Sequence, residues 1–327
     1  MIKVGVIGTG VMGAGHARFI NQHVKNAEVI GISDINVEGM KKLADDLGTV
    51  IIQTTDPEEL AKSPEIDALL IASPDQFHAS QIRLALKYKK PTLCEKPLAS
   101  TLEDARAITK EIDEAEAAAG KKLINIGFMR RFDPGFVKVK TEVESGKYGK
   151  PLYVRVVSRN HFSPGTTSEG ILINSAVHDF DIYRWMFNSE WESVQPFHPR
   201  HTDQAPEDVR DPLIFIATMK NGIILIANAS ANGAAGYDTR AEVVCETGSI
   251  EIGPFGDVAV RTLDKYEANH GGKMEINWMK KFEQAYINEL QAWADELETG
   301  VVNNNFATHK DALIANETAQ MGVDSFK

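Results

Sequence analysis

Cysteine is nearly absent from the sequence, which has only Cys94 and Cys245 among its 327 residues. Two cysteines that do not pair at metal-ligand spacing give neither a disulfide framework nor a cysteine-based metal site, and they predict a protein of the reducing cytoplasm. Long apolar runs are missing too, since no segment approaches the roughly 20 apolar residues that a membrane-spanning helix needs. The first apolar residues lead into a glycine loop, which is not the pattern of a signal peptide. We therefore expect no membrane association.

Basic residues are outnumbered, with 35 Lys and Arg against 46 Asp and Glu and a formal net charge of −11. Binding to a phosphate backbone needs clustered positive charge, so the balance argues against nucleic acid as a main partner. The nine histidines form no cluster with Cys or carboxylates at metal-ligand spacing, so no metal is expected. A hydrophobic content of 43% is ordinary for a globular protein, and the length suits two domains.

The first part of the chain alternates short apolar runs with amphipathic stretches. The apolar runs are nearly continuous, as expected for buried parallel strands, and cover residues 3–7, 28–33, 68–72, 91–95 and 123–127. Helical spacing is found between them at 12–25, 36–47, 77–88 and 101–119, and Asp56-Pro57 opens a shorter helix. This repetition predicts an α/β domain with a doubly wound parallel sheet of the Rossmann type.

From Pro151 onward the pattern changes and strands dominate. They are predicted at 152–158, 212–219, 223–229, 240–245, 249–252 and 258–263, with a hairpin signal at Asn221-Gly222. Helices are predicted at 133–144, 175–187, 278–299 and 309–323. We expect an α+β domain with an open, mostly antiparallel sheet, and we place the boundary so that the domains are residues 1–126 and 127–327.

Glycines follow the first predicted strand in the order Gly8-Thr9-Gly10-Val11-Met12-Gly13. In a dinucleotide-binding loop the first glycine permits a tight turn, the second lets the backbone approach the pyrophosphate, and the third allows close strand–helix packing. The motif alone is a weak signal, but here a strand precedes it, a helix follows it, and Asp34 ends the next strand. A carboxylate there binds the adenosine ribose and repels a 2′-phosphate, so we predict NAD rather than NADP. The alternative is a glycine-rich turn that binds no ligand.

Two further groups of residues are candidates for catalysis. Glu95-Lys96-Pro97 ends the fifth predicted strand, and ligands bind at the carboxyl ends of such strands, although a surface ion pair would explain Glu95 and Lys96 as well. In the second domain Asn174 and His178 are four residues apart, so they share a face if the helix begins at or before Asn174. A histidine on so apolar a helix is more often a hydrogen-bonded core residue than a catalyst, and the spacing alone does not decide.

The combination of these features resembles the family of glucose-fructose oxidoreductase and inositol dehydrogenase. The features are the glycine fingerprint, Ala72-Ser73-Pro74, Glu95-Lys96-Pro97, and a histidine followed by aspartate on a helix of the second domain. The resemblance covers nearly the whole chain and is strongest to bacterial inositol 2-dehydrogenases. It extends over residues 127–133, 159–160, 177–181, 184–185, 236–238 and 242–244.

The resemblance implies roles for individual residues. Lys96 would hydrogen-bond the reacting oxygen and help to relay its proton, and His178 would be the general base. Arg130 would contact the substrate or brace the site, while Asn160 and Tyr237 would contact ring hydroxyls. NAD would be contacted by Gly8, Gly10, Val11, Met12, Gly13, Asp34, Ala72, Ser73, Pro74, Glu95 and Lys96.

The same resemblance implies a reaction and an assembly. A hydride passes from a ring secondary alcohol of a small polyhydroxylated substrate, such as myo-inositol or a close isomer, to NAD, and leaves a ketone. The pKa of a histidine suits a general base, and a lysine ammonium stabilises charge on oxygen. The Lys96–Pro97 bond would be cis. Residues 1–126 would bind NAD, and residues 127–327 would bind substrate and form a homodimer or homotetramer through the open sheet.

Three positions depart from the family pattern. Asn174 stands where inositol dehydrogenases carry an aspartate paired with the histidine, Ser158 where a histidine is expected, and Ala235 where a tyrosine is expected. Asparagine can accept a hydrogen bond from the imidazole but offers no negative charge to the imidazolium. These departures leave open another cyclitol or a pyranose sugar as substrate. A non-catalytic NAD-binding regulator and a structural subunit are the alternatives from other functional classes.

Overall fold

The computed structural model describes residues 1–163, 165–233, 236–253, 258–262, 266–267, 275 and 277–326. It divides into two compact units, Met1–Phe132 with Gln284–Ile314 and Asp133–Glu283 with Ala315–Lys327. A single boundary after residue 126 was predicted from the sequence, but residues 127–132 and 284–314 lie with the first unit. The reason is apolar burial, because Leu290 and Trp293 are part of the same core as the first strands.

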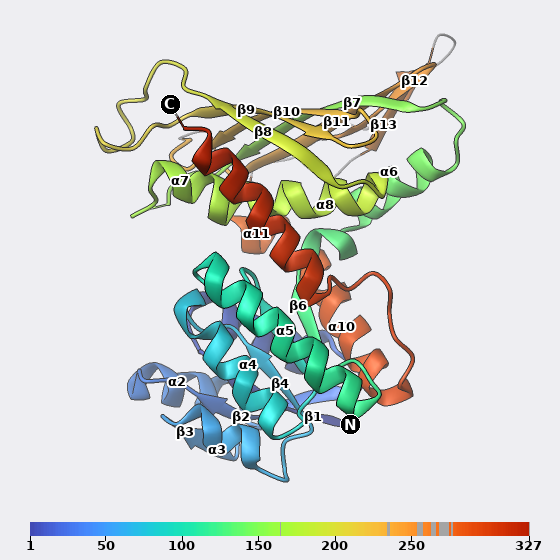
Figure 1. Ribbon diagram of the computed structural model, residues 1–327. Coiled ribbons are helices and arrows are strands. Elements are labelled where there is room, and N and C mark those ends of the chain that lie inside the picture. The colour runs from blue at the N-terminus through green and yellow to red at the C-terminus, as the bar shows by residue number, and fades with distance from the viewer. Residues whose placement is uncertain are drawn as a thin grey trace. The chain divides into compact units, whose positions relative to one another are not determined.

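The sheet of the first unit is entirely parallel (Figure 1). Its strand order is β3-β2-β1-β4-β5-β6, the order of dinucleotide-binding folds, in which ligands bind outside the carboxyl ends of the strands. The predicted Rossmann sheet is therefore confirmed. The strands are β1 (Ile2–Ile7), β2 (Ala27–Ser33), β3 (Ile52–Thr54), β4 (Ala68–Ile71), β5 (Thr92–Glu95) and β6 (Ile124–Gly127).

The helices of this unit begin at capping residues that the sequence provides. Asn36, Asp56 and Thr101 each accept a hydrogen bond from a backbone N–H in the first turn of the helix that follows, as N-cap residues do. None of the helices among the described residues has the length and apolar character to cross a membrane. The helices are α1 (Val11–His23), α2 (Val37–Leu47), α3 (Pro57–Lys62), η1 (Asp75–Phe77), α4 (His78–Lys87), α5 (Leu102–Ala119), η2 (Met129–Phe132), most of α10 (Glu283–Thr299) and the start of α11 (His309–Asp324).

The second unit is built on an open sheet in the order β14-β13-β12-β11-β7-β10-β9-β8. Among the strands that the structure describes, only β10 and β7 pair in parallel, and the other neighbours are antiparallel, so the predicted mostly antiparallel sheet is confirmed. The strands are β7 (Pro151–Arg159), β8 (Trp191–Phe197), β9 (Leu213–Met219), β10 (Ile224–Ser230), β11 (Asp238–Cys245), β12 (Gly248–Ile252), β13 (Val258–Thr262) and β14 (Tyr266–Glu267). Residue 263, the last of one predicted strand, lies outside the described residues.

Helices cover one face of this sheet (Figure 1). Burial alternates along the strands, so that Val154 and Val156 of β7 are buried while Arg155 between them is exposed, as expected when one face packs on a core and the other does not. The helices are α6 (Pro134–Glu144), α7 (Ser168–Gly170), the π-helical turn η3 (Ile171–Ala176), α8 (Val177–Phe187), α9 (Trp278–Lys281) and the second half of α11.

Candidate active site

The glycine loop after β1 is shaped for close backbone contact. Gly8 has φ +89°, and a Cβ there would lie 2.5 Å from the backbone of Ser73, while a Cβ on Gly13 would lie 1.8 Å from the carbonyl oxygen of Gly8. Gly10 is different, because a Cβ there would meet no atom within 4 Å. Only the middle glycine therefore faces open space, at the N-cap of α1. This is the arrangement that admits a pyrophosphate to free N–H groups at a helix N-terminus.

Asp34 follows β2 beside this loop and is held by hydrogen bonds. Its Oδ2 atom accepts from the backbone N–H and the hydroxyl of Thr9 at 2.6 and 2.9 Å, and its Oδ1 accepts from the N–H of Asn36 at 2.8 Å. Burial by itself raises the pKa of Asp34, but these hydrogen bonds outweigh burial and lower it below the usual value. The carboxylate is thus ionised at neutral pH, which suits the ribose hydroxyls of NAD and disfavours a 2′-phosphate.

Lys96 lies directly after β5, which pairs with β4. The peptide bond between Lys96 and Pro97 is cis, as predicted. Desolvation is the main effect and lowers the pKa of Lys96. The negative charge of Glu95 opposes this lowering, the positive charge of Arg130 adds to it, and the negative charge of Asp75 also opposes it. A lysine with a lowered pKa can both donate a hydrogen bond and give up its proton, which is what proton transfer requires.

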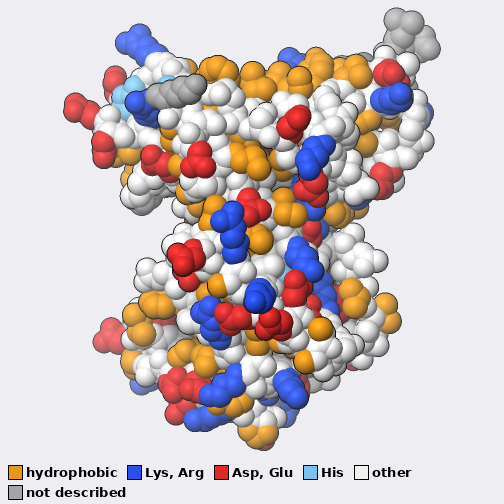
Figure 2. Space-filling view, in the orientation of Figure 1, with side chains coloured by type: hydrophobic (Ala, Val, Ile, Leu, Met, Phe, Trp, Pro, Cys, Tyr) orange, Lys and Arg blue, Asp and Glu red, His pale blue; other side chains and the backbone are white. Residues whose placement is uncertain are grey.

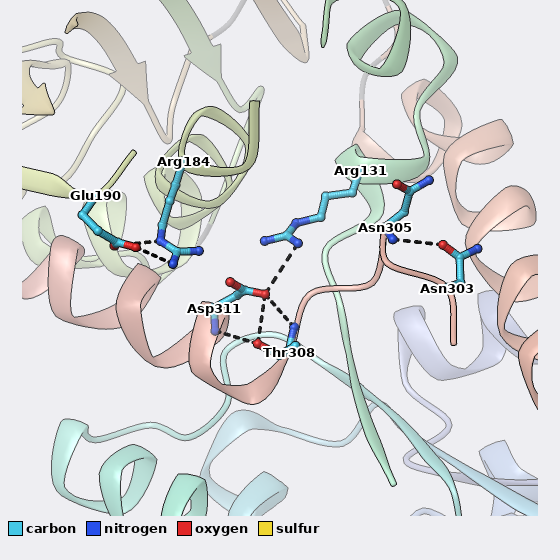
Figure 3. Close-up of polar contacts among 7 residues, drawn as sticks. All are labelled: Arg131, Arg184, Glu190, Asn303, Asn305, Thr308 and Asp311. Atoms are coloured by element: carbon cyan, nitrogen blue, oxygen red, sulfur yellow. Dashed lines mark hydrogen bonds and ion pairs between the residues drawn. The ribbon is translucent and has the colours of Figure 1, made fainter. Parts of the chain in front are cut away.

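Arg130 belongs to the turn η2 directly after β6, and only 1% of its surface is exposed. Its neighbour Arg131 points toward Asp311 at the start of α11, with 3.6 Å between Nη1 and Oδ2 (Figure 3). The same carboxylate oxygen accepts hydrogen bonds from the N–H and the hydroxyl of Thr308. Arg131 therefore ties the turn to a helix cap, which holds Arg130 in a fixed segment.

His178 lies in the first turn of α8, directly after the π-helical turn η3 that contains Asn174. The helical backbone runs without a break from Ser168 to Phe187, so the condition for a shared face, a helix that starts at or before Asn174, is met. Single π-helical turns inside α-helices are frequent at functional sites. At the other end of α8, Arg184 donates two hydrogen bonds to Glu190 (Figure 3), which fixes the helix against the start of β8.

Asn160 and Tyr237 lie on the two chain segments that flank the paired ends of β7 and β11. The N–H of Asn160 donates to the carbonyl of Ser230 at 2.7 Å, its carbonyl accepts from Gly233 at 2.8 Å, and its side-chain amide donates to the hydroxyl of Ser175 at 3.3 Å. The last contact links Asn160 to the turn that carries Asn174. Tyr237 is buried, with its ring edge-on to Phe282.

The structure thus gathers the predicted residues in two sets. The first unit holds the glycine loop, the residues after β4 and Lys96 around the carboxyl edge of one sheet, together with Asp34 and Arg130. The second unit links Asn160 to the helix of His178, while Ser158 lies buried on β7 and Ala235 lies outside the described residues. Within the described part of the chain, no three His, Cys, Asp or Glu side chains gather as metal ligands would.

Two buried histidines that were not predicted as site residues contact the residues on either side of Lys96. His16 of α1 contacts Glu95 at 2.7 Å between Nε2 and Oε1, and His78 of α4 contacts the carbonyl oxygen of Pro97 at 2.7 Å through Nδ1. The partners of both histidines are distant in sequence, so no local sequence pattern predicts these contacts.

A parallel sheet in this strand order, with a glycine loop after its first strand and an ionised carboxylate after its second, defines an NAD-binding domain, and the comparisons with known proteins make the chain an NAD-dependent dehydrogenase. Residues 2–121 match the model of an oxidoreductase family with an NAD-binding Rossmann fold, and residues 136–251 match the C-terminal domain of the same family. The chain belongs to this family, that of glucose-fructose oxidoreductase, inositol dehydrogenase and their relatives (GFO/IDH/MocA).

Three relatives illustrate the similarity. Inositol 2-dehydrogenase 4 of Saccharopolyspora erythraea is 32% identical over 98% of this chain and 92% of its own. An inositol 2-dehydrogenase/D-chiro-inositol 3-dehydrogenase of Shouchella clausii is 34% identical over 90% of this chain and 83% of its own. The crystal structure of myo-inositol dehydrogenase from Lactobacillus casei, in complex with NAD(H) and myo-inositol, superposes with a TM-score of 0.87 at 30% identity, covering 99% of this chain and 94% of that one.

Proposed function

We propose that this dehydrogenase oxidises a ring secondary alcohol of a cyclitol, myo-inositol or a close isomer, to the corresponding inosose. The observation that carries the proposal is the similarity to the Lactobacillus casei enzyme, which extends over almost the whole of both chains. That enzyme was crystallised in complex with NAD(H) and myo-inositol. The Shouchella clausii relative is named for two cyclitols, which supports cyclitols as the substrate class and leaves the isomer to experiment.

In this proposal two side chains move the proton of the alcohol. Lys96 donates a hydrogen bond to the reacting oxygen and stabilises the charge that develops on it. His178 accepts the hydroxyl proton as general base. NAD⁺ supplies the hydride acceptor. The lowered pKa of Lys96, which desolvation causes against the opposing charge of Glu95, favours its part in the proton relay.

The remaining residues of the site would select the substrate. Asn160 and Tyr237 would hydrogen-bond ring hydroxyls, and Arg130 would contact the ring or brace Lys96. Asn174 would orient the imidazole of His178 without giving it a negative charge. A change from aspartate to asparagine in such a pair lowers turnover sharply in serine proteases, so we propose that the asparagine suits a ring isomer other than the one for which the aspartate is optimal.

The uncovered face of the eight-stranded sheet would serve assembly of identical chains. Figure 2 shows hydrophobic side chains in a row along this face, and Leu152, Ile216, Ile224 and Ile226 are among the exposed large hydrophobic residues. Contiguous exposed apolar surface of this kind marks an interaction site. We propose a homodimer or homotetramer through this face.

The deciding experiment is an assay of NAD⁺ reduction, followed by the absorbance of NADH, against inositol isomers and pyranose sugars. Turnover with one cyclitol, and a ketone product identified by mass spectrometry, is the expected result. Turnover with pyranoses alone would replace the cyclitol by a sugar. Binding of NAD⁺ by calorimetry without turnover on any member of the panel would contradict the enzyme proposal and favour the regulator.

A further inference from the structure

Lys96 lies between two residues that are each held by a buried histidine. Glu95 precedes it and contacts His16 from α1, and Pro97 follows it and contacts His78 from α4. Both histidines are only 1% exposed. The two helices flank different strands of the same sheet, so the loop that carries Lys96 is held from two independent elements.

His16 fixes the carboxylate of Glu95. Its Nε2 lies 2.7 Å from Oε1 of Glu95, and the ring packs edge-on against Tyr286 with 5.3 Å between centroids. The other oxygen, Oε2, accepts a hydrogen bond from the backbone N–H of Lys96 at 3.3 Å. Glu95 therefore bridges the histidine and the lysine backbone, and its negative charge opposes the lowering of the Lys96 pKa.

His78 connects the loops that follow two neighbouring strands. Its Nδ1 lies 2.7 Å from the carbonyl oxygen of Pro97 after β5, and its Nε2 lies 2.9 Å from the carbonyl oxygen of Ser73 after β4. Carbonyl oxygens only accept hydrogen bonds, and a neutral imidazole has one N–H. Each contact is a hydrogen bond when the ring nitrogen concerned carries the proton, because the carbonyl oxygen can only accept.

We propose that His16 and His78 are positioning residues for Lys96. His16 holds the carboxylate that keeps the lysine protonated, and His78 holds the backbone on the other side of the lysine and joins it to the loop of Ser73. The groups that act on the charge of Lys96 are Glu95, Arg130 and Asp75. The two histidines act on the lysine through Glu95 and Pro97.

The proposal rests on the proposed function for its turnover measurement, so the first test needs no substrate. Lys96 is labelled with an amine-acylating reagent across a pH series, and the modified peptide is quantified by mass spectrometry. In the His16→Leu variant we expect the midpoint of labelling to move to lower pH. Without the contact from His16, the carboxylate of Glu95 is no longer fixed beside Lys96 and stabilises its ammonium form less. In His16→Gln the midpoint should stay near that of the parent, since the Gln amide nitrogen is as many bonds from Cα as Nε2.

The matched control is His309→Leu. His309 is also a buried histidine of the first unit with its Nε2 2.9 Å from a carboxylate oxygen, that of Asp113, but it contacts neither Glu95 nor Pro97 in the described structure. Its variant should leave the labelling midpoint of Lys96 in place. An unmoved midpoint in His16→Leu, or an equal shift in the control, would overturn the role of His16.

The second test separates the two contacts of His78. The amide nitrogen of Asn is as many bonds from Cα as Nδ1, so His78→Asn can restore the hydrogen bond to Pro97. By the same count His78→Gln can restore the bond to Ser73. A small misplacement of a reacting group costs about 100-fold in rate, so we expect His78→Leu to lower kcat by ~10–100-fold. His78→Asn, which keeps the bond to Pro97, should recover kcat but raise the KM for NAD⁺. His78→Gln, which keeps the bond to Ser73, should recover the KM for NAD⁺ but not kcat.

Rates are expressed per NAD⁺-binding site, so that a misfolded fraction does not count as lost activity. Equal kcat values for the Asn and Gln variants would contradict the positioning of Lys96 through Pro97. If no substrate is found, the same His78 variants are compared by the labelling midpoint of Lys96. A midpoint that moves in His78→Gln and not in His78→Asn supports the proposal, and any other order overturns it.

Discussion

Asp211 accepts two hydrogen bonds from Asn232, one from its backbone N–H at 2.8 Å and one from its side-chain amide at 3.0 Å. The same oxygen, Oδ2, accepts a third from the N–H of Ala231, and only 1% of Asp211 is exposed. The turn fixed in this way follows Ser230, whose carbonyl accepts the hydrogen bond of Asn160. A buried carboxylate thus supports the segment on which a proposed substrate residue depends.

Replacing Asp211 by alanine should destabilise the second unit by about 3 kcal/mol, because three buried donors lose a charged partner. We expect a lower midpoint of urea denaturation and a higher KM for the substrate. Asp208→Ala, at an exposed position of the neighbouring loop, is the control and should change neither. A wild-type midpoint for Asp211→Ala would show that the turn is held by other contacts.

Replacing Lys96 by alanine should lower kcat by about 10²–10⁴-fold, the range of general acid–base catalysis, while the affinity for NAD⁺ measured by calorimetry stays within a few-fold. Lys110→Ala on the exposed face of α5 is the control. Desolvation lowers the pKa of Lys96 despite the opposing charge of Glu95. As the pH rises, the ammonium of Lys96 therefore loses its proton at a pH below 10.5, the ordinary pKa of a lysine. Turnover that depends on this ammonium should decline at the same alkaline pH. An unchanged kcat in the variant would remove Lys96 from the reaction.

Replacing Asp34 by alanine should lower the preference for NAD⁺ over NADP⁺ by about tenfold or more, since the juxtaposition of a carboxylate and a 2′-phosphate costs several kcal/mol. The hydrogen bonds from Thr9 and Asn36 outweigh burial and lower the pKa of Asp34. The preference of the parent protein should therefore persist as the pH falls to the ordinary pKa of an aspartate. The ratio of kcat/KM values for the two cofactors is the measurement, and an unaltered ratio would place the ribose elsewhere.

Replacing Asn174 by aspartate should raise kcat on myo-inositol, because a carboxylate stabilises the imidazolium that forms at His178. Asn221→Asp adds the same charge at a hairpin turn of the sheet and serves as the control. A gain in kcat on myo-inositol together with a fall on another isomer would indicate that the asparagine selects that other isomer. A fall on all substrates would contradict the proposed pairing with His178.

Replacing Ile226 by glutamate should weaken self-association. Ile226 is exposed on β10 beside Ile216 of β9 and Arg155 of β7, in the middle of the uncovered face. Burying a charge there without a partner is costly, so the mass measured by light scattering should shift toward that of one chain. Val301→Glu, at an even more exposed apolar position of the first unit, should leave the mass unchanged. An oligomer that persists in Ile226→Glu would show that another surface carries assembly.

The sequence predicted both sheets because their patterns are local. Buried parallel strands are short apolar runs, and the glycine loop carries its own spacing. Strands β3 and β8 were missed for a physical reason. Ile52–Thr54 is a three-residue edge strand, and Trp191–Phe197 at the other sheet's edge has a polar face and a proline, which weaken the strand pattern.

The parts of the site that depend on distant contacts could not be predicted. His16 and His78 lie 79 and 19 residues from their partners beside Lys96, and spacing rules act over a few residues only. The π-helical turn before His178 likewise has no signal in composition. The domain boundary was predicted at the point where strands and helices stop alternating. This pattern does not indicate that α10, much later in the sequence, packs in the core of the first unit.

The return of α10 has a consequence for the synthesis of the protein. Leu290 and Trp293 pack in the same core as Val4 and Leu93, so the unit whose first strand emerges earliest from the ribosome is completed only near the end of the chain. At about 5–20 residues per second, roughly 8–30 s separate the emergence of Phe132 from that of Leu290. During this interval the nascent sheet exposes the apolar surface that α10 later covers, and a binding site for chaperones is open for that time.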